Sequence, residues 1–214
     1  MIWKRTRQSH HDRQDSTLRQ IKQADLEMLE WASAVGEISL KYLDESGFCL
    51  WSAVGHTYFF RGEQKRQEQT ACRGRRLSIL GFWELGVCFE YGLAIGSFRG
   101  PSYIRLMDWQ AHKAQRRLEG SNQITVIVQD NSSLHTSQLV QQKWQQWQNQ
   151  GLYLFWLPTY CSQMNRIEDE WEQIKDKEIA GQMFEDELEL AYAVMQGIEA
   201  RAHKGNYRVE RFRF

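Results

Sequence analysis

The sequence predicts an α/β fold with a mixed central sheet and helices on both faces. Two features indicate it: apolar strands follow one another in the first half of the chain, and helices alternate with strands in the second half. Residues 124–128 are almost entirely apolar, as expected of a strand buried on both faces. Parallel strands require crossover connections, and the helical segments of the second half can supply them.

The N-terminal part is predicted to hold a tail followed by a helix. The first fifteen residues show no apolar period, and we expect residues 1–23 to form a linker or tail ahead of a single domain over 24–214. Apolar periodicity predicts a helix over about 17–35, and Gly36 stands where glycine favours ending it. The apolar residues that share one face of this helix are Ile21, Met28, Ala32 and Val35.

Strands are predicted on both sides of a loop over residues 61–76. The first strand runs into Asp44, and Ser46-Gly47 predicts a tight turn into a returning strand. The loop itself is inferred from its charged, irregular composition. The strands expected in this part cover residues 38–42, 48–54, 77–83 and 86–95.

The second half is predicted to alternate between helices and strands. Pro101 lies in the first turn of one helix, where proline is tolerated. Trp144 and Trp147 share an apolar helix face with Val140, which favours core packing over stacking on nucleic-acid bases. Helices are expected over 100–117, 134–147, 166–179 and 185–202, and strands over 124–128 and 153–156.

Composition is that of a folded protein with one domain. At 214 residues, 42% hydrophobic and with only two prolines, the chain can bury a core and is not a disordered protein. No run approaches 18 apolar residues and no leader opens the chain, so we expect neither a membrane span nor a secretory signal. Scattered cysteines favour reduced thiols in a cytoplasmic protein over a zinc site. They are Cys49, Cys72, Cys88 and Cys161.

Charge is unevenly distributed, although 27 basic and 27 acidic residues cancel. Segment 61–76 holds six basic residues against two acidic ones, while an acidic surplus follows Glu168. A neutral total can therefore hide one basic face suited to contact with phosphates, although a merely solvated loop is the alternative. The six basic residues are Arg61, Lys65, Arg66, Arg73, Arg75 and Arg76.

Two carboxylates follow predicted strands. Asp130 ends the buried strand over 124–128, at the carboxyl edge where ligands bind in open α/β sheets. Asp44 lies at the end of the strand that begins near residue 38. Each also has an ordinary structural interpretation, because Asp44 suits a turn and Asp130 suits the cap of the following helix.

A third carboxylate lies near the start of the helix predicted over 166–179. Asn165 and Glu168 together imitate a capping box, which is the structural alternative for this acid. Helical periodicity directs Asp169 to solvent but does not decide between Glu168 and Glu170, which flank the core-facing stripe on either side. The stripe consists of Ile167, Trp171 and Ile174.

Acidic oxygens from separate elements suit Mg²⁺, which binds a few carboxylates together with water and substrate phosphate. Two such ions, about 3.5–4 Å apart, clamp the attacking and leaving oxygens of an in-line displacement at phosphorus. Close carboxylates repel one another, and a metal removes that cost. The pattern therefore predicts a metal-dependent site that acts on phosphodiesters, formed by Asp44, Asp130 and an acid at the start of the late helix.

Three blocks of the chain resemble the catalytic motifs of DDE transposases, and most of all the mariner superfamily in its bacterial insertion-sequence branch. The resemblance extends from about Ala24, and its last block is the most specific. The blocks are Leu43-Asp44-Glu45-Ser46-Gly47-Phe48, Val128-Gln129-Asp130-Asn131 with His135, and Leu157-Pro158-x-Tyr160-x-Ser162-x-Met164-Asn165-x-Ile167-Glu168-x-x-Trp171.

The resemblance implies a ribonuclease-H-like fold and two Mg²⁺ (or Mn²⁺) ions held by Asp44, Asp130 and Glu168. Glu168 is implied because it matches the acid of the family's Asn-Pro-Ile-Glu motif, whereas Glu170 does not. Two prolines of the family pattern are replaced by Ser162 and Arg166. The implied activity is cleavage of DNA at element ends, followed by strand transfer into a short TA-type target.

The implied partners are double-stranded DNA, both element ends and target, and a second copy of the chain in a synaptic homodimer. The six basic residues of segment 61–76 and His135 are the expected phosphate contacts, although His135 also suits a bystander beside a helix cap. Family members carry helix-turn-helix modules ahead of the catalytic domain, and we expect this chain to begin after them. The alternatives are an inactive remnant or interaction module, and a structure-selective nuclease of the same fold.

Overall fold

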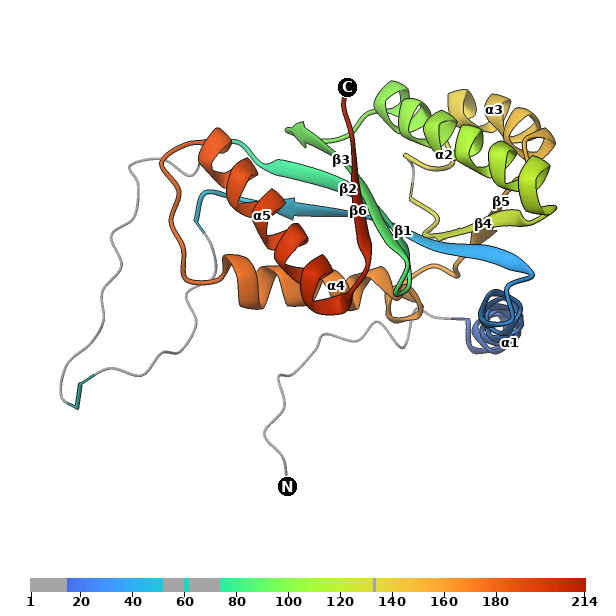
Figure 1. The fold of residues 1–214 in the computed structure, drawn as a ribbon, viewed down its shortest axis with the longest axis horizontal. Coiled ribbons are helices and arrows are strands. Elements are labelled where there is room, and N and C mark those ends of the chain that lie inside the picture. The colour runs from blue at the N-terminus through green and yellow to red at the C-terminus, as the bar shows by residue number, and fades with distance from the viewer. Residues whose placement is uncertain (1–14, 52–59, 62–73, 133) are drawn as a thin grey trace.

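The structure, a computed structural model, describes residues 15–51, 60–61, 74–132 and 134–214. It contains a six-stranded mixed sheet in the order β5-β4-β1-β2-β3-β6, which confirms the predicted α/β class (Figure 1). The strands are β1 (Ile38–Phe48), β2 (Leu77–Glu84), β3 (Cys88–Ile95), β4 (Ile124–Gln129), β5 (Leu152–Trp156) and β6 (Arg208–Phe212). The helices are α1 (Ser16–Ala34), α2 (Gly100–Ser121), α3 (Gln138–Asn149), α4 (Ile167–Gln173) and α5 (Glu187–Gly205). A 3₁₀ turn, η2 (Ser162–Met164), precedes α4, and a π-helical segment, η3 (Ile174–Ile179), continues it.

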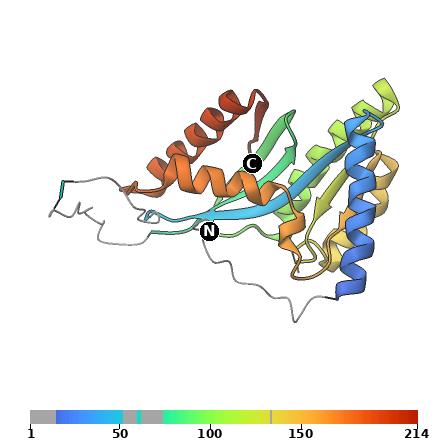
Figure 2. The same cartoon turned by 90° about the horizontal axis from the view of Figure 1, so that it is seen from below.

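Helices cover both faces of the sheet, as predicted. Figures 1 and 2 show α4 and α5 together on one side and α2 and α3 on the other. Because successive side chains of a strand point to opposite faces, β1 supplies both cores. Leu40 and Tyr42 pack in the cluster that includes Trp171 of α4, whereas Leu43 packs in the cluster that includes Tyr103 of α2.

The strand pairing brings the ends of β1 and β4 to one level. β1 pairs in parallel with β4, and Tyr42 lies opposite Val128 in that register. Asp44 of β1 and Asp130, the residue that follows β4, each lie two positions beyond this pair. β1 also pairs with β2 in the antiparallel direction, so the sheet is mixed around its central strand.

The predicted turn at Ser46-Gly47 is wrong. β1 continues as an eleven-residue strand to Phe48, with Ser46 paired to Ile79 and Gly47 paired to Ser78 of β2. The strand expected over 48–54 is also wrong in its described part: Trp51 forms one isolated bridge with Met183, and residues 52–54 lie outside the described residues. Pairing along the whole length of β1 outweighs the local preference of serine and glycine for turns.

Gly47 serves close packing here. A Cβ at this position would lie 2.1 Å from Nε of Arg76, so the glycine makes room for the arginine side chain to pass across the strand. A sequence pattern cannot distinguish this role from a turn, because both favour a residue without a side chain.

Helix α1 begins at Ser16, where Asp15 caps it by accepting hydrogen bonds from the backbone N–H groups of Thr17 and Leu18, both 3.0 Å long. The boundary predicted between residues 23 and 24 therefore falls inside a helix. The apolar face identified from periodicity points to solvent, with Met28 72% exposed. Leu26, on the opposite face, is the residue of α1 buried in the core.

Three further details differ from the prediction. Helix α3 begins at Gln138 instead of residue 134, because residues 134–136 form a turn. Strand β6 was not predicted, since its sequence Arg-Val-Glu-Arg-Phe holds only two apolar residues; it pairs in parallel with β3. Trp147 is buried as predicted, whereas Trp144 is half-buried and packs against Trp156 with ring centroids 5.6 Å apart. Among the described helices, none is long and apolar enough to cross a membrane.

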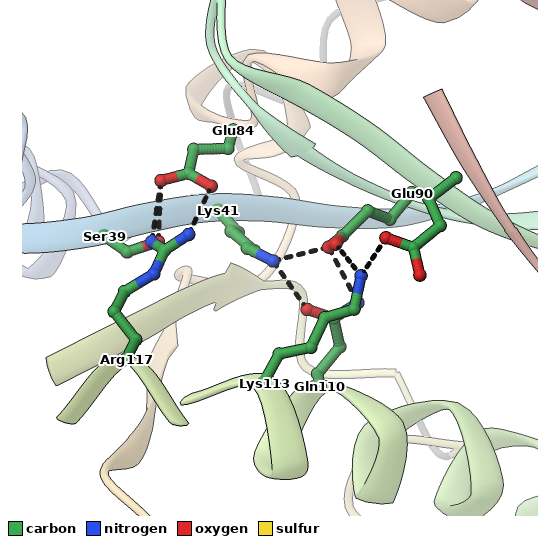
Figure 3. A network of polar contacts seen from close by, with 8 residues as sticks. Ser39, Lys41, Glu84, Glu90, Gln110, Lys113 and Arg117 are labelled. Atoms are coloured by element: carbon green, nitrogen blue, oxygen red, sulfur yellow. Dashed lines mark hydrogen bonds and ion pairs between the residues drawn. The ribbon is translucent and has the colours of Figure 1, made fainter. Parts of the chain in front are cut away.

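A charged network lies between α2 and the sheet (Figure 3). Lys41 of β1 donates hydrogen bonds to Glu90 of β3 and to Gln110 of α2, and all three side chains are buried. Lys113 of α2 also donates to Glu90. Burial alone would raise the pKa of Glu90, but the two ammonium groups outweigh it and lower the pKa to about 2. The network therefore holds ionised groups that neutralise one another.

Candidate active site

Asp44 lies inside β1, where its neighbours fix the face of its side chain. By the alternation of the strand it shares a face with Leu40 and Tyr42, on the side covered by α4. Across the antiparallel pair it lies opposite Gly81 of β2. Asp44 is half-buried and therefore stands at the margin of the core, not in an exposed turn.

Gly81 determines how closely α4 approaches Asp44. A Cβ on Gly81 would lie 2.7 Å from the ring of Trp171, so the glycine forms a flat area of sheet on which the indole packs. The same indole meets Phe89 edge-on, with ring centroids 5.3 Å apart. Trp171 lies three residues beyond Glu168, which places Glu168 on the turn of α4 nearest to Asp44.

Asn165 ties the start of α4 to β1. Its Nδ2 donates a 2.8 Å hydrogen bond to the carbonyl oxygen of Leu43, the residue before Asp44. The capping-box alternative for Asn165 and Glu168 is wrong, because Arg166 occupies the N-cap position and no side chain of the described residues caps the helix there. The backbone N–H of Glu168 instead donates to the carbonyl oxygen of Asn165, at 3.1 Å. Asn165 thus fixes the start of α4, which carries Glu168, beside the part of β1 that carries Asp44.

The structure distinguishes Glu168 from Glu170, which periodicity could not. Glu170 is 3% exposed and accepts two 3.0 Å hydrogen bonds from the guanidinium of Arg201 and a 2.6 Å bond from the hydroxyl of Tyr207. It therefore holds α4 against α5 and against Tyr207, which immediately precedes β6. Glu168 is half-buried on the side that faces Asp44, and Asp169 is exposed as predicted.

Asp130 follows β4 and is held by the turn that comes after it. Its Oδ1 accepts a 3.2 Å hydrogen bond from the backbone N–H of Ser132 and lies 2.8 Å from Nδ1 of His135. The imidazole contributes most to lowering the pKa of Asp130. The alternative of a helix cap is wrong, because the next helix begins only at Gln138.

His135 lies behind Asp130 and away from solvent. It is 3% exposed, and its ring lies 4.8 Å from that of Tyr103 of α2. The Tyr103 hydroxyl in turn donates a 2.8 Å hydrogen bond to Gln129, the residue before Asp130. This buried contact explains the position of Asp130 and leaves little of His135 to meet a DNA phosphate directly.

Asp44, Asp130 and Glu168 line one cavity of about 390 Å³. Burial raises the pKa of Asp44 to about 7, and the negative charges of Glu168 and Asp130 add to that rise. Glu168 and Asp130 are therefore each near enough to Asp44 for their negative charges to repel its carboxylate. Asn165 also lines this cavity, and its Oδ1 is a buried oxygen with no hydrogen-bond partner among the described residues.

These oxygens suit a hard divalent cation, although they do not form a finished cage. Within the described parts of the chain, no three His, Cys, Asp or Glu side chains are arranged to hold a metal ion by themselves. Mg²⁺ takes one or two carboxylates and completes its shell with water and substrate phosphate. The donor set fits such an ion, and positive charge at this point would relieve the repulsion that raises the pKa of Asp44.

The predicted basic residues divide between three positions. Arg76 lines a neighbouring cavity that also contains Asp44 and Glu168, and it forms a 3.3 Å ion pair with Glu45. Arg75 lies 3.6 Å from Glu187 at the start of α5. Arg61 is exposed and lines neither cavity. Lys65, Arg66 and Arg73 lie outside the described residues.

The family model described as DDE superfamily endonuclease matches residues 39–191, which include all three acids. The chain belongs to this family. A search of curated proteins finds no match.

Solved structures similar to this member of the family include Mos1 transposase chains. A Mos1 paired-end complex with the left transposon end matches at 13% identity and a TM-score of 0.64, covering 96% of this chain and 65% of that one. A mariner Mos1 paired-end complex with Mg matches at 14% identity and 0.64, covering 94% and 60%. The isolated catalytic domain of Mos1 mariner transposase matches at 9% and 0.55, covering 95% of each chain. The ribonuclease-H-like fold is thereby confirmed, and this chain spans less than two thirds of the length of the transposases in the paired-end complexes.

Sequence reasoning missed one residue and one contact of the site. Lys175 lines the cavity that contains Arg76, Asp44 and Glu168. It follows Glu168 by seven residues, a spacing that places two residues on one helix face, so periodicity could have identified it. The contact between Trp171 and Gly81 could not be found in this way, because it joins residues 90 positions apart on different elements.

Proposed function

We propose that the chain is a transposase catalytic domain that cleaves DNA phosphodiesters at the ends of a mobile element and joins the freed 3′-hydroxyl to target DNA. The observation that carries the proposal is the cavity shared by Asp44, Asp130 and Glu168, in which burial and the negative charges of Glu168 and Asp130 raise the pKa of Asp44. Close carboxylates of this kind would destabilise the fold if they served structure alone. They suit a site that binds cations together with a phosphodiester. The family match and the likeness to Mos1 support the same chemistry.

We propose Asp44, Asp130 and Glu168 as the residues that hold Mg²⁺ or Mn²⁺, two ions by analogy with two-metal phosphoryl transfer. Bound there, the cations would polarise the phosphodiester and favour an in-line displacement. Asp44 has to lose its proton to serve as a ligand, and its pKa of about 7 places that loss near neutral pH. Mos1 complexes solved with Mg and with Mn support this choice of metals.

The remaining residues keep the acids in place. His135 orients Asp130 through its Nδ1, and Asn165 keeps the start of α4 against β1. Trp171 seats the helix on Gly81, so that Glu168 faces Asp44. Rigid support of this kind aligns groups for reaction and lowers the entropic part of the barrier.

The partners we propose are duplex DNA and a second copy of the chain that pairs two element ends. The Mos1 paired-end complexes support this arrangement. We also propose a bacterial insertion-sequence origin and action in the cytoplasm or nucleoid, with residues 24–214 as the catalytic unit. Arg61, Lys65, Arg66, Arg73, Arg75 and Arg76 are proposed to position DNA through its phosphates, without reading sequence.

The decisive experiment measures nicking of a duplex that carries the ends of the element encoding the chain. We expect wild-type protein to nick in Mg²⁺ and to stop in EDTA, and Asp130→Asn to lose the activity. Equal nicking by wild type and variant would reject the catalytic assignment. Absence of nicking by wild type that binds the duplex would favour an inactive remnant, and equal nicking of a duplex without the ends would favour a structure-selective nuclease.

A further inference from the structure

A separate cavity of about 460 Å³ lies on the face of the sheet that α2 covers. Its described lining includes Lys41 of β1, Lys113 of α2 and Arg208 of β6, and two of these belong to the charged network of Figure 3. It shares no described lining residue with the cavity of the three acids. Cavities of about 300–1,000 Å³ commonly bind small molecules, so this one has the size of a ligand site.

The acids that line this cavity already have cationic partners. Lys113 forms ion pairs with both Glu90 and Glu210. Arg117 forms a 2.9 Å ion pair with Glu84. These pairs include every acid of the described lining, so a cation from solution would find no unpaired carboxylate there.

Two arginines of the same cavity have no such partner. Arg116 of α2 and Arg208 of β6 are both exposed. Within the described residues, neither side chain forms an ion pair or a hydrogen bond. The described lining holds five cationic side chains and three acidic ones, so the cavity has an excess of two positive charges.

The two arginines reach the cavity from different elements. Arg208 pairs with Cys88 of β3, and by the alternation of β6 it shares a face with Glu210, which bonds to Lys113. Arg116 follows Lys113 by three residues, so the two are neighbours on the surface of α2. The guanidinium groups therefore approach one cavity from its helical wall and from the edge of the sheet.

We propose that this cavity binds a small phosphorylated molecule, whose phosphate group is held between Arg116 and Arg208. One guanidinium presents a fork of N–H donors that can bind both oxygens of a carboxylate. Two unpaired forks in one cavity instead suit a phosphate, which has further oxygens for the second fork. A phosphate monoester carries about −1.5 to −2 charges at pH 7, which matches the excess of two positive charges.

The cavity is suited to binding and not to covalent chemistry. Cys88 is the one thiol in its described lining. Burial raises the pKa of this thiol to about 11, so it keeps its proton at neutral pH. Because the thiolate is the nucleophilic form, Cys88 has little reactivity toward a bound ligand.

A small molecule fits this cavity better than a DNA duplex does. A duplex carries about one charge per 1.7 Å of its axis, spread along an extended surface. The positive excess here is confined to one hollow, and three acids in the same lining would repel an extended polyanion. A compact phosphate can meet the two arginines without approaching every acid.

A bound phosphate would connect α2 to the edge strand β6, which pairs in the sheet with β3 alone. A ligand that binds only the folded state stabilises it. We therefore expect glycerol phosphate, a small phosphate monoester, to raise the melting temperature of the chain. The concentration dependence of that rise gives the affinity.

The test measures this stabilisation in EDTA, at constant ionic strength, for wild type, Arg116→Gln and Arg208→Gln. The matched control is Arg213→Gln, since Arg213 is exposed, lies just beyond β6 and lines neither this cavity nor that of the three acids. We expect each of the two cavity variants to weaken binding at least about tenfold, as for the loss of a charge-assisted hydrogen bond. Arg213→Gln should bind as wild type does, and acetate should stabilise wild type far less than glycerol phosphate.

Several outcomes would reject the site. Glycerol phosphate that does not stabilise wild type, or that stabilises both cavity variants equally well, would do so. So would a loss in Arg213→Gln as large as that in Arg208→Gln, or equal stabilisation by acetate. A tenfold loss of duplex affinity in both variants, without any effect of glycerol phosphate, would assign the arginines to DNA instead. Because the stabilisation is measured without divalent metal and without DNA, its result does not depend on whether the chain cleaves DNA.

Discussion

Lys41 and Asp44 stand three residues apart on β1, yet their surroundings are opposite. Lys41 points beneath α2, where it meets Glu90 and Gln110 in a closed set of hydrogen bonds (Figure 3). Asp44 points beneath α4, where the negative charges of Glu168 and Asp130 act on it. The same strand thus supports a neutralised network on one face and a concentration of negative charge on the other.

The pKa values record this difference. Burial would raise the pKa of both Glu90 and Asp44, but the ammonium groups beside Glu90 lower its pKa to about 2, whereas the acids beside Asp44 help to raise its pKa to about 7. A charged group that only stabilises a fold is given partners by the protein. A charged group that lies beside like charges instead indicates a binding partner that comes from outside the protein.

The largest effect is expected when Glu168 and Glu170 are compared. Glu168→Gln removes a proposed metal ligand, and we expect nicking to fall by about a thousandfold, or about 4 kcal/mol of barrier, with little change in stability. Glu170→Gln breaks the buried contacts with Arg201 and Tyr207 and should lower the free energy of unfolding by about 3 kcal/mol, with activity kept per folded molecule. Nicking assays and urea denaturation of both variants check this, and interchanged results would contradict it.

The neutralised network is tested next. Lys41→Met leaves Glu90 buried with one ammonium partner fewer, and we expect a loss of about 3–5 kcal/mol in the free energy of unfolding. Replacing Glu90 by leucine in the same protein removes the stranded charge and should restore part of that loss. Denaturant titration of the single and double variants measures the difference, and a Lys41→Met protein as stable as wild type would show that the network is dispensable.

The acid cavity makes a smaller, pH-dependent contribution. Because the folded pKa of Asp44 lies above its ordinary value of 3.8, the folded protein keeps a proton that the unfolded chain loses, and stability falls as pH rises from about 4 to about 7. Asp44→Asn removes this loss, so without metal it should gain stability relative to wild type by on the order of 1–2 kcal/mol between pH 4 and pH 8. A stability difference independent of pH would contradict the raised pKa.

The smallest effect is expected at Asn165. Asn165→Ala removes the hydrogen bond to the carbonyl of Leu43 and should cost about 1 kcal/mol of stability, with a moderate fall in nicking because Glu168 is less firmly placed. Gln163→Ala, at an exposed position of the same loop, serves as the control and should behave as wild type. Nicking rates and melting temperatures of the two variants check this prediction. Equal values for Asn165→Ala and Gln163→Ala would show that Asn165 does not help to place Glu168.

Local sequence predicted the helices and most strands. In α3 and α4 the apolar period matches the buried face, whereas in α1 it indicated a face that is exposed. The apolar run of β4 likewise predicted the position of Asp130 at the end of a buried strand. Local sequence failed at Ser46-Gly47, where pairing with β2 continues through a sequence typical of turns and Gly47 makes room for Arg76. No local pattern contains that information, because the partner strand begins 30 residues after Gly47, at Leu77.

The candidate site was predictable in its acids but not in their support. The motif resemblance singled out Glu168, whereas periodicity left Glu170 equally possible. Only the folded chain shows that Glu170 is engaged in hydrogen bonds, since its donors Arg201 and Tyr207 are distant in sequence. The packing of Trp171 of α4 on Gly81 of β2 is likewise a contact between distant elements, which no local sequence pattern can predict.

The central claim is that Asp44, Asp130 and Glu168 bind divalent cations together. Calorimetric titration of Mn²⁺ into wild-type protein with a bound duplex, compared with Asp44→Asn, Asp130→Asn and Glu168→Gln, tests it most directly. We expect wild type to bind Mn²⁺ and each single variant to lose at least about tenfold in affinity. Equal Mn²⁺ binding by all four proteins would contradict the account.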